Sequence, residues 1–188
     1  MRFGPHLVLF PMPDEFFDVV DERDVVVGRA TRREVHACGL WHRAVHVIVT
    51  NKAGKVFLQK RSMAKDISPG KWDSSCSGHV DSGEDYDAAA VRELGEELGL
   101  RAAVPARWFR VEACEQTGWE FVWVYRLSHG GPFELQASEI ERGEWLLPDE
   151  ITLRMRRRPD DYTPAFRLIW PKLSGQERSG ASSNYPGA

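Results

Sequence analysis

The chain has 188 residues, of which 25 are lysine or arginine and 28 are acidic, so its formal net charge is −3. This length allows one domain with a sizeable core, and the charge balance excludes a surface that coats a nucleic-acid polymer. The longest apolar run is too short to cross a bilayer, so no membrane-spanning helix is expected. Three cysteines are too few, and odd in number, for a disulfide framework, so we expect a cytoplasmic protein.

The first half of the chain predicts an N-terminal arm followed by strands. Residues 1–13 contain three prolines and are expected to lie extended along the surface. Within residues 14–35, the segments FFDVV and VVVGRA predict a hairpin whose turn is DERD. The alternating, β-branched segment RAVHVIVT predicts a central strand, and KVFLQKR predicts its hairpin partner after the turn NKAG.

Three histidines lie close together around the start of the expected central strand. His36 and His42 are six residues apart, across an expected turn, and His46 follows within the strand. A packed or hydrogen-bonding role accounts for each of them, and the alternative is a second metal or substrate contact near a cleft. Arg61 and Lys65 begin the next loop, where their charges either suit a phosphorylated ligand or are solvated.

The second half of the chain predicts more strands and two terminal helices. The segments AAVPARWFRVEACEQ and GWEFVWVYRLSH predict two strands, and Glu120 begins the second one. QASEIERGEWLLP predicts a loop entering a short strand, while PDEITLRMRRR and TPAFRLIWPKL predict helices. Residues 174–188 predict a flexible polar tail. This order predicts an α+β fold, a mixed sheet covered on both faces, within a single domain of residues 14–173.

The segment from Gly78 to Leu100 predicts a loop feeding an acidic helix. Glu93, Glu96 and Glu97 fall on one face of that helix, and repulsion between like charges four residues apart costs about 0.2–0.5 kcal/mol. A hard divalent cation removes this repulsion because it prefers oxygen ligands, which favours Mg²⁺ with Mn²⁺ as the alternative. Taken alone, the three glutamates are more typical of a solvated acidic helix face than of a metal site.

The spacing around the acidic helix favours the metal site. The pattern is Gly78, five residues, Glu84, seven residues, Arg92-Glu93-Leu94, one residue, Glu96-Glu97, one residue and Gly99-Leu100. It resembles the Nudix box at every fixed position and at both apolar positions, so the chain is identified as a member of the Nudix hydrolase superfamily. This resemblance implies the Nudix fold, an α/β/α sandwich with a mixed sheet.

The resemblance implies chemical roles for the residues of the box. Glu93, Glu96 and Glu97 would hold the metal, and Gly78 would let a backbone carbonyl approach it. Glu93 is also a candidate for the base that takes a proton from the attacking water. Other family members place that base on a later loop, where the candidates are Glu139, Glu141 and Glu144.

Three other residues of the box have structural roles in this resemblance. Glu84 and Arg92 would form an ion pair that fixes the loop against the helix. Gly99 would end the helix in a left-handed conformation, which glycine adopts without steric cost.

Over roughly residues 14–173, the chain also resembles the branch of the superfamily that contains isopentenyl-diphosphate isomerase. In that branch, Arg61 and Lys65 match residues that hold the diphosphate. Glu120 matches one of two metal-binding glutamates. The histidines of the same metal site are matched by His36, His42 and His79.

Departures from the isomerase pattern favour hydrolysis over isomerisation. The position of the isomerase cysteine is Ser77, and Cys76 lies one residue earlier, on the opposite face of a strand. The partner position of Glu120 is Gly118, which has no side-chain ligand. The isomerases have a degenerate box, whereas the box of this chain is intact.

The sequence therefore predicts an enzyme that hydrolyses a diphosphate linkage with Mg²⁺, in a nucleoside-diphosphate-like or other diphosphate-linked small molecule. The alternatives are isomerase activity and a non-catalytic ligand-binding module. Selectivity is expected to depend on loops near Trp108, Trp119 and Trp123. The substrate, the number of metal ions and the oligomeric state stay open.

Overall fold

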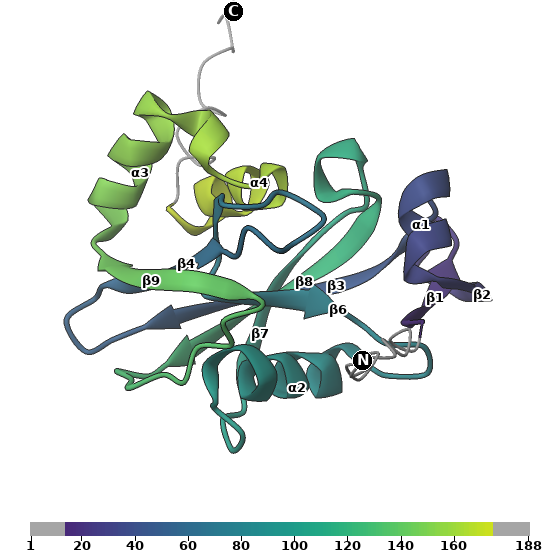
Figure 1. Cartoon of the computed structure of the whole chain (residues 1–188), viewed down its shortest axis with the longest axis horizontal. Helices are drawn as coiled ribbons and strands as arrows, with labels where there is room; N and C mark the ends of the chain where they lie inside the picture. Colours follow the sequence, from purple (N-terminus) through teal and green to yellow (C-terminus); the bar gives the residue numbers. More distant parts are fainter. Residues whose placement is uncertain (1–13, 175–188) are drawn as a thin grey trace, which may run out of the picture.

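A computed structural model describes residues 14–174, which form two sheets and four α-helices (Figure 1). The expected arm, residues 1–13, and nearly all of the expected tail lie outside the described residues. The strands are β1 (Phe16–Val20), β2 (Val26–Thr31), β3 (His42–Thr50), β4 (Val56–Arg61), β5 (Trp72–Asp73), β6 (Cys76–His79), β7 (Ala106–Val111), β8 (Glu120–Ser128) and β9 (Ile140–Leu146). The helices are α1 (Arg32–Cys38), α2 (Tyr86–Leu98), α3 (Pro148–Arg157) and α4 (Pro164–Leu173), with 3₁₀ turns η1 (Glu115–Thr117) and η2 (Pro159–Asp161).

The larger sheet is mixed, as predicted. Its strands follow the order β5-β4-β3-β8-β7, with β6 also paired to β3 and β9 also paired to β4. Strands β3 and β8 run parallel, and the other pairs are antiparallel. Because His42 and Glu120 are partners in the parallel register, the first residues of these two strands lie side by side.

Helices cover both faces of the larger sheet, which confirms the predicted α/β/α sandwich (Figure 1). Helix α2 packs on one face, while α3 and α4 pack on the other. Alternation along β3 sends Ala44 and Ile48 into the core beneath α4, and Val45 and Val47 into the core beneath α2. The central strand therefore contributes to both halves of the core.

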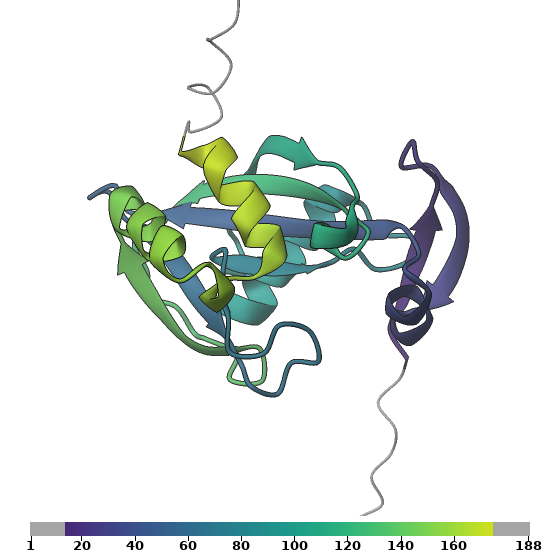
Figure 2. The same cartoon turned by 90° about the horizontal axis from the view of Figure 1, so that it is seen from above.

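The N-terminal hairpin is shorter than predicted, because residues 32–38 form helix α1. Thr31 and Glu34 make a capping box at its start, and Gly39 ends it in the left-handed region. The hairpin of β1 and β2 is the purple element at one end of Figure 2, beside α1 and away from α3 and α4. Phe17 of this hairpin stacks on the ring of His79, with the ring centroids 4.5 Å apart.

Helix α2 begins and ends at residues with clear capping roles. The Asp85 carboxylate accepts hydrogen bonds from the backbone N–H groups of Asp87 and Ala88. Gly99 follows the helix with a φ of 73°, the left-handed geometry expected of it. No helix in residues 14–174 is long and apolar enough to cross a membrane.

Candidate functional site

Helix α2 presents its glutamates to a cavity at the end of strand β6. Glu97 is buried, Glu93 is nearly so, and the side chain of Glu96 is 60% exposed. We call this space the carboxylate cavity, and its main lining residues are Lys65, Gly78, Glu93, Glu96, Glu97 and Glu139. The three glutamates of the box thus share one cavity, although only two of them are withdrawn from solvent.

Arg92 organises the acidic side of this cavity. Its Nε and Nη2 donate to the two carboxylate oxygens of Glu84 at 3.0 and 2.9 Å. Its Nη1 donates to Glu93 at 2.6 Å and to Glu96 at 3.1 Å, and Nη2 also donates to the carbonyl oxygen of His79 at 2.9 Å. One guanidinium therefore ties the loop before α2, two box glutamates and strand β6 together.

Gly78 is required for the close approach of Glu93. A Cβ placed at Gly78 would lie 2.1 Å from both Cδ and Oε1 of Glu93, which no real side chain could tolerate. The glycine thus makes room for a carboxylate, a role beyond the backbone access expected from the sequence.

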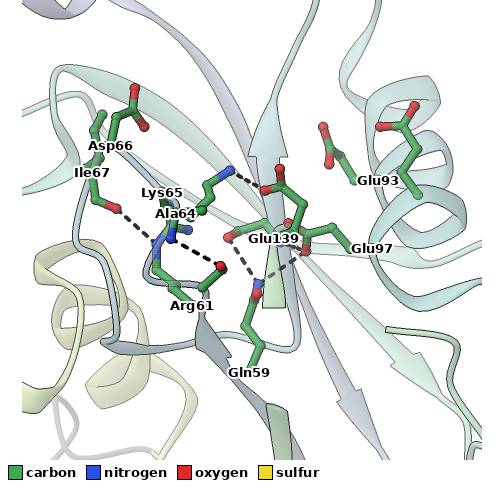
Figure 3. Close-up of polar contacts among 12 residues, drawn as sticks. Gln59, Arg61, Ala64, Lys65, Asp66, Ile67, Glu93, Glu97 and Glu139 are labelled. Atoms are coloured by element: carbon green, nitrogen blue, oxygen red, sulfur yellow. Dashed lines mark hydrogen bonds and ion pairs between the residues drawn. The ribbon is translucent and has the colours of Figure 1, made fainter. Parts of the chain in front are cut away.

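Glu97 is anchored from the sheet. The backbone N–H of Ser77 donates to its Oε2 at 3.1 Å, and the side-chain amide of Gln59 donates to the same oxygen at 3.2 Å (Figure 3). Strand β4 supplies Gln59 and strand β6 supplies Ser77. The carboxylate is consequently held in one orientation before any ligand binds.

Burial dominates the acid–base properties of these carboxyl groups. It raises the pKa of Glu97 to about 8, and the charge of Glu93 adds to this effect. Burial also raises the pKa of Glu93 to about 7, even though Arg92 opposes the rise. Two neighbouring carboxylates that resist ionisation mark a place where a cation would be stabilised.

The loops opposite α2 bring one lysine and one further glutamate to the carboxylate cavity. Lys65 and Glu139 form an ion pair that faces Glu93 and Glu97 (Figure 3). Glu139 is the only one of the three loop carboxylates named from the sequence that lines this cavity. Glu141 and Glu144 instead pair with arginines and a lysine on the sheet surface.

Arg61 lies apart from the box glutamates. Its Nε donates to the carbonyl oxygen of Ile67 at 3.2 Å (Figure 3). Its Nη1 lies 3.7 Å from a carboxylate oxygen of Asp73. It lines a second cavity, which also contains His36, His46, His79 and Glu120 and which we call the histidine cavity. Lys65, Ser77, Gly78 and His79 line both cavities, so the two spaces adjoin along β6.

The histidine cavity borders a cluster of three imidazoles. One ring nitrogen each of His36, His42 and His79 lies within 4.8 Å of the others, and the Nε2 atoms are buried without hydrogen-bond partners among the described residues. Glu120 Oε1 is 3.1 Å from Nε2 of His79 and 3.5 Å from Nε2 of His42, within ion-pair distance of both rings. These four residues converge from α1, β3, β6 and β8.

Two imidazoles of this cluster, those of His36 and His79, favour their neutral form. Burial lowers the pKa of His36 to about 4, helped by the other two rings, and burial also lowers the pKa of His79. The Nδ1 of His42 lies 2.9 Å from the carbonyl oxygen of Leu40, so Nδ1 carries the proton and Nε2 presents a lone pair. Burial alone would raise the pKa of Glu120, but the neighbouring rings outweigh it and lower that pKa.

The residues named from the sequence divide between the two cavities, and Glu120 lies beside the histidines with which the isomerase-branch resemblance groups it. Glu120 lies with the histidines and not with the glutamates of α2, and Gly118 lines the same cavity. Cys76 is buried in the core beneath α2, whereas Ser77 lines both cavities. None of Trp108, Trp119 and Trp123 lines either cavity.

Some cavity residues were not identified from the sequence. Arg32 lines both cavities and pairs with Glu15 and Asp66, but it was not identified because it is the first residue of the unpredicted helix α1. Gln59 supports the carboxylate cavity through Glu97 without lining it, and from the sequence it was only one residue of the expected hairpin strand KVFLQKR. The one signal for it was a polar residue in the otherwise apolar first half of VFLQKR.

Comparison with known proteins places these features in context. The NUDIX domain model matches residues 40–166. An uncharacterized Nudix hydrolase of Yersinia pestis is 41% identical over 155 residues, which is 80% of each chain. The Nudix hydrolase YfcD of Escherichia coli K12 is 37% identical over 173 residues, which is 88% of this chain and 91% of YfcD. The crystal structure of DR0079 from Deinococcus radiodurans superposes with a TM-score of 0.69 at 30% identity, covering 76% of this chain and 90% of that one.

Proposed function

Since the chain belongs to the Nudix hydrolase family, we propose that it hydrolyses a diphosphate linkage in a small molecule with the help of Mg²⁺, or of Mn²⁺ as the alternative. The observation that carries this proposal is the pair Glu93 and Glu97. These carboxyl groups are buried side by side on α2 at the wall of a cavity, where burial opposes their ionisation. A cation bound between them would stabilise the ionised carboxylates and offset the unfavourable free energy of burying their charges.

The residues of the carboxylate cavity fit a hard divalent ion. Glu93, Glu96 and Glu97 offer carboxylate oxygens, the ligand type that Mg²⁺ and Mn²⁺ prefer. The space beside Gly78, which a Cβ would fill, keeps the Glu93 carboxylate in the cavity. When bound, such an ion neutralises diphosphate oxygens and acidifies water.

The remaining residues have roles in orientation and charge. Arg92 holds Glu93 and Glu96 in place, while Glu84 anchors Arg92 itself. Lys65 lies where the two cavities adjoin and can exchange its partner Glu139 for a non-bridging oxygen of the substrate. Arg61 would contact a diphosphate only where the substrate extends into the histidine cavity.

In the proposed reaction, a water oxygen attacks one phosphorus of the diphosphate while the bond to the bridging oxygen breaks. A carboxylate takes the proton of the attacking water. Glu93 is the first candidate for this base. Glu139 is the alternative, because it lines the same cavity from the opposite side and is released when Lys65 turns to the substrate.

Glu120 belongs to a second cation site in this proposal, together with His36, His42 and His79. Buried imidazole nitrogens next to a carboxylate, three of them within 4.8 Å of one another, are suitable ligands for a borderline divalent ion. This site would lie beside the substrate in the histidine cavity rather than among the box glutamates.

Isomerisation of an isopentenyl diphosphate is the second candidate function, and the histidine cluster is the feature that favours it. Against it, Ser77 lines both cavities where that chemistry uses a cysteine, and Cys76 faces the core. Incubation with isopentenyl diphosphate, followed by analysis for the allylic isomer, distinguishes the two reactions. The allylic isomer in place of inorganic phosphate would overturn hydrolysis.

The test of the proposed function is phosphate release from a panel of nucleoside diphosphates, nucleotide sugars, dinucleotides and prenyl diphosphates, with and without Mg²⁺. We expect Mg²⁺-dependent release by the native protein and loss of about 10³-fold in the double variant Glu96→Gln with Glu97→Gln. Glu22→Gln, at an exposed turn, is the matched control. Full activity in the double variant would refute the metal assignment. Absence of release from every substrate would favour a non-catalytic module.

A further inference from the structure

Gln59 is a buried amide on the face of the sheet that α2 covers. On strand β4, Val56 and Leu58 enter the core beneath α4, whereas Phe57 enters the core beneath α2. By the same alternation Gln59 points toward α2, and only 1% of its surface is exposed. A buried amide is costly unless its polar atoms are hydrogen-bonded, so its position here requires an explanation.

The contacts of Gln59 converge on one oxygen of Glu97. Its Nε2 donates to Glu97 Oε2 at 3.2 Å, and the backbone N–H of Ser77 donates to that same atom at 3.1 Å. A third contact, from Nε2 to the hydroxyl of Ser77, is long at 3.5 Å. Gln59 and Ser77 thus both hold Oε2, so Oε1 is the oxygen of Glu97 that neither of them engages, and Glu97 lines the carboxylate cavity.

The amide orientation of Gln59 follows from the acceptor role of Glu97 Oε2, which also accepts a hydrogen bond from the backbone N–H of Ser77. If the amide were turned over, its carbonyl oxygen would face the Glu97 carboxylate, and two acceptors would repel each other. In the observed orientation, the carbonyl oxygen Oε1 of Gln59 is buried without a hydrogen-bond partner among the described residues. Donation to Glu97 is therefore maintained although it leaves another polar atom of the same amide unsatisfied.

We propose that Gln59 is a positioning residue for cation binding: it fixes Oε2 of Glu97 so that Oε1 is presented to a divalent ion. This inference rests on the proposed function, because it needs Glu97 to be a ligand. Residues that orient a ligand by hydrogen bonding contribute about 10–100-fold to metal affinity in other sites. The unpaired carbonyl oxygen of Gln59 also belongs to the ligand class that a hydrated Mg²⁺ accepts.

The test is the dissociation constant for Mg²⁺ alone, measured by isothermal titration without substrate. The variant Gln59→Met keeps the length of the side chain and removes the donor. The matched control is Leu58→Met, the adjacent buried residue on β4, whose side chain faces the other half of the core. We expect the dissociation constant to rise about 10–100-fold in Gln59→Met and to change less than about twofold in Leu58→Met.

A second measurement uses the native protein and does not depend on the variant folding. The side-chain amide resonance of Gln59, followed by NMR during Mg²⁺ titration, is expected to shift with the same midpoint as the calorimetric binding curve. Unchanged Mg²⁺ affinity in folded Gln59→Met, or an amide resonance that does not respond, would overturn the role of Gln59. Loss of Mg²⁺ binding in Glu97→Gln alongside either result would leave the proposed function intact, whereas undiminished binding in Glu97→Gln would refute both.

Discussion

The two cavities along β6 shift the pKa values of their buried glutamates in opposite directions. In the carboxylate cavity, Glu93 and Glu97 are buried close together and their pKa values are raised to about 7 and about 8. In the histidine cavity, Glu120 lies beside imidazoles that lower its pKa, and two of the rings are themselves pushed toward neutrality. Arg92 and Lys65 line the first cavity without preventing the rise of these two pKa values, whereas the second cavity borders buried ring nitrogens that have no hydrogen-bond partner among the described residues. The difference indicates a hard oxygen site next to a mixed nitrogen and oxygen site.

The largest loss of activity is expected from Gly78→Ala, which alters the carboxylate cavity by displacing Glu93. The added methyl group would overlap the Glu93 carboxylate and push it out of the cavity. We expect the rate of Mg²⁺-dependent phosphate release to fall about 10²–10³-fold. Gly28→Ala is the matched control, because a Cβ there meets its nearest neighbour at 3.9 Å. Equal activity of the two variants would show that Glu93 is not needed where it lies.

A smaller effect is expected from Arg92→Lys, which keeps the charge and removes the two-pronged contact with Glu84. The lysine cannot join Glu84, Glu93, Glu96 and the carbonyl oxygen of His79 at once. We expect the free energy of unfolding, measured by urea denaturation, to fall by about 1–3 kcal/mol. Arg158→Lys, at an exposed ion pair with Asp161, serves as the control with a change of about 0–1 kcal/mol. Similar values for both would mean that Arg92 acts only as a surface charge.

The smallest effect, a dependence of melting temperature on pH, has opposite signs for the two cavities. In the folded protein the pKa values of Glu93 and Glu97 are about 7 and about 8, above the ordinary value of 4.5 that applies in the unfolded chain. The folded state therefore binds protons more tightly, and folding stability falls as pH rises from about 4.5 to about 8. His36 has an ordinary pKa of 6.5 and a folded value of about 4, so its contribution rises with pH between about 4 and 6.5.

Variants separate these two pH contributions. Between pH 6.5 and 8 the histidines no longer contribute, so this window reports on the carboxyl groups. In metal-free buffer, the melting temperature of the native protein is expected to fall across it by a few degrees at most, and that of Glu97→Gln is expected to fall less. Added Mg²⁺ should have the same effect on the native protein, because it favours the ionised carboxylates. His36→Asn should instead flatten the rise below pH 6.5. A melting temperature that is constant from pH 6.5 to 8 in the native protein would contradict the burial of the carboxyl groups.

The fold and the acidic helix could be predicted because their signals are local in sequence. The alternation of RAVHVIVT gave the central strand, and the fixed spacing from Gly78 to Gly99 placed three glutamates on one helix turn. Helix α1 was not predicted, because its seven residues are too few to show a clear helical periodicity of apolar residues. The capping box of Thr31 and Glu34 was present in the sequence. A short helix is identified from its cap rather than from its apolar pattern.

The isomerase-branch resemblance grouped Glu120 with the three histidines, but the position of that group beside the box glutamates could not be predicted, because it depends on pairing between distant strands. Glu120 joins the histidines through the parallel register of β3 and β8, which places it opposite His42. Gln59 reaches Glu97 only because β4 and α2 pack on each other across the core. Glu139 differs from Glu141 and Glu144 by the direction of its side chain at the start of β9, which a sequence of closely spaced glutamates does not reveal.

The most direct test is anomalous diffraction from crystals of the native protein grown with Mn²⁺. We expect a peak within about 2.5 Å of carboxylate oxygens of both Glu93 and Glu97 in the carboxylate cavity. A second peak among His36, His42, His79 and Glu120 would support the mixed site. Manganese bound only at that second position, with Glu93 and Glu97 bare, would contradict the assignment of the α2 glutamates to the metal.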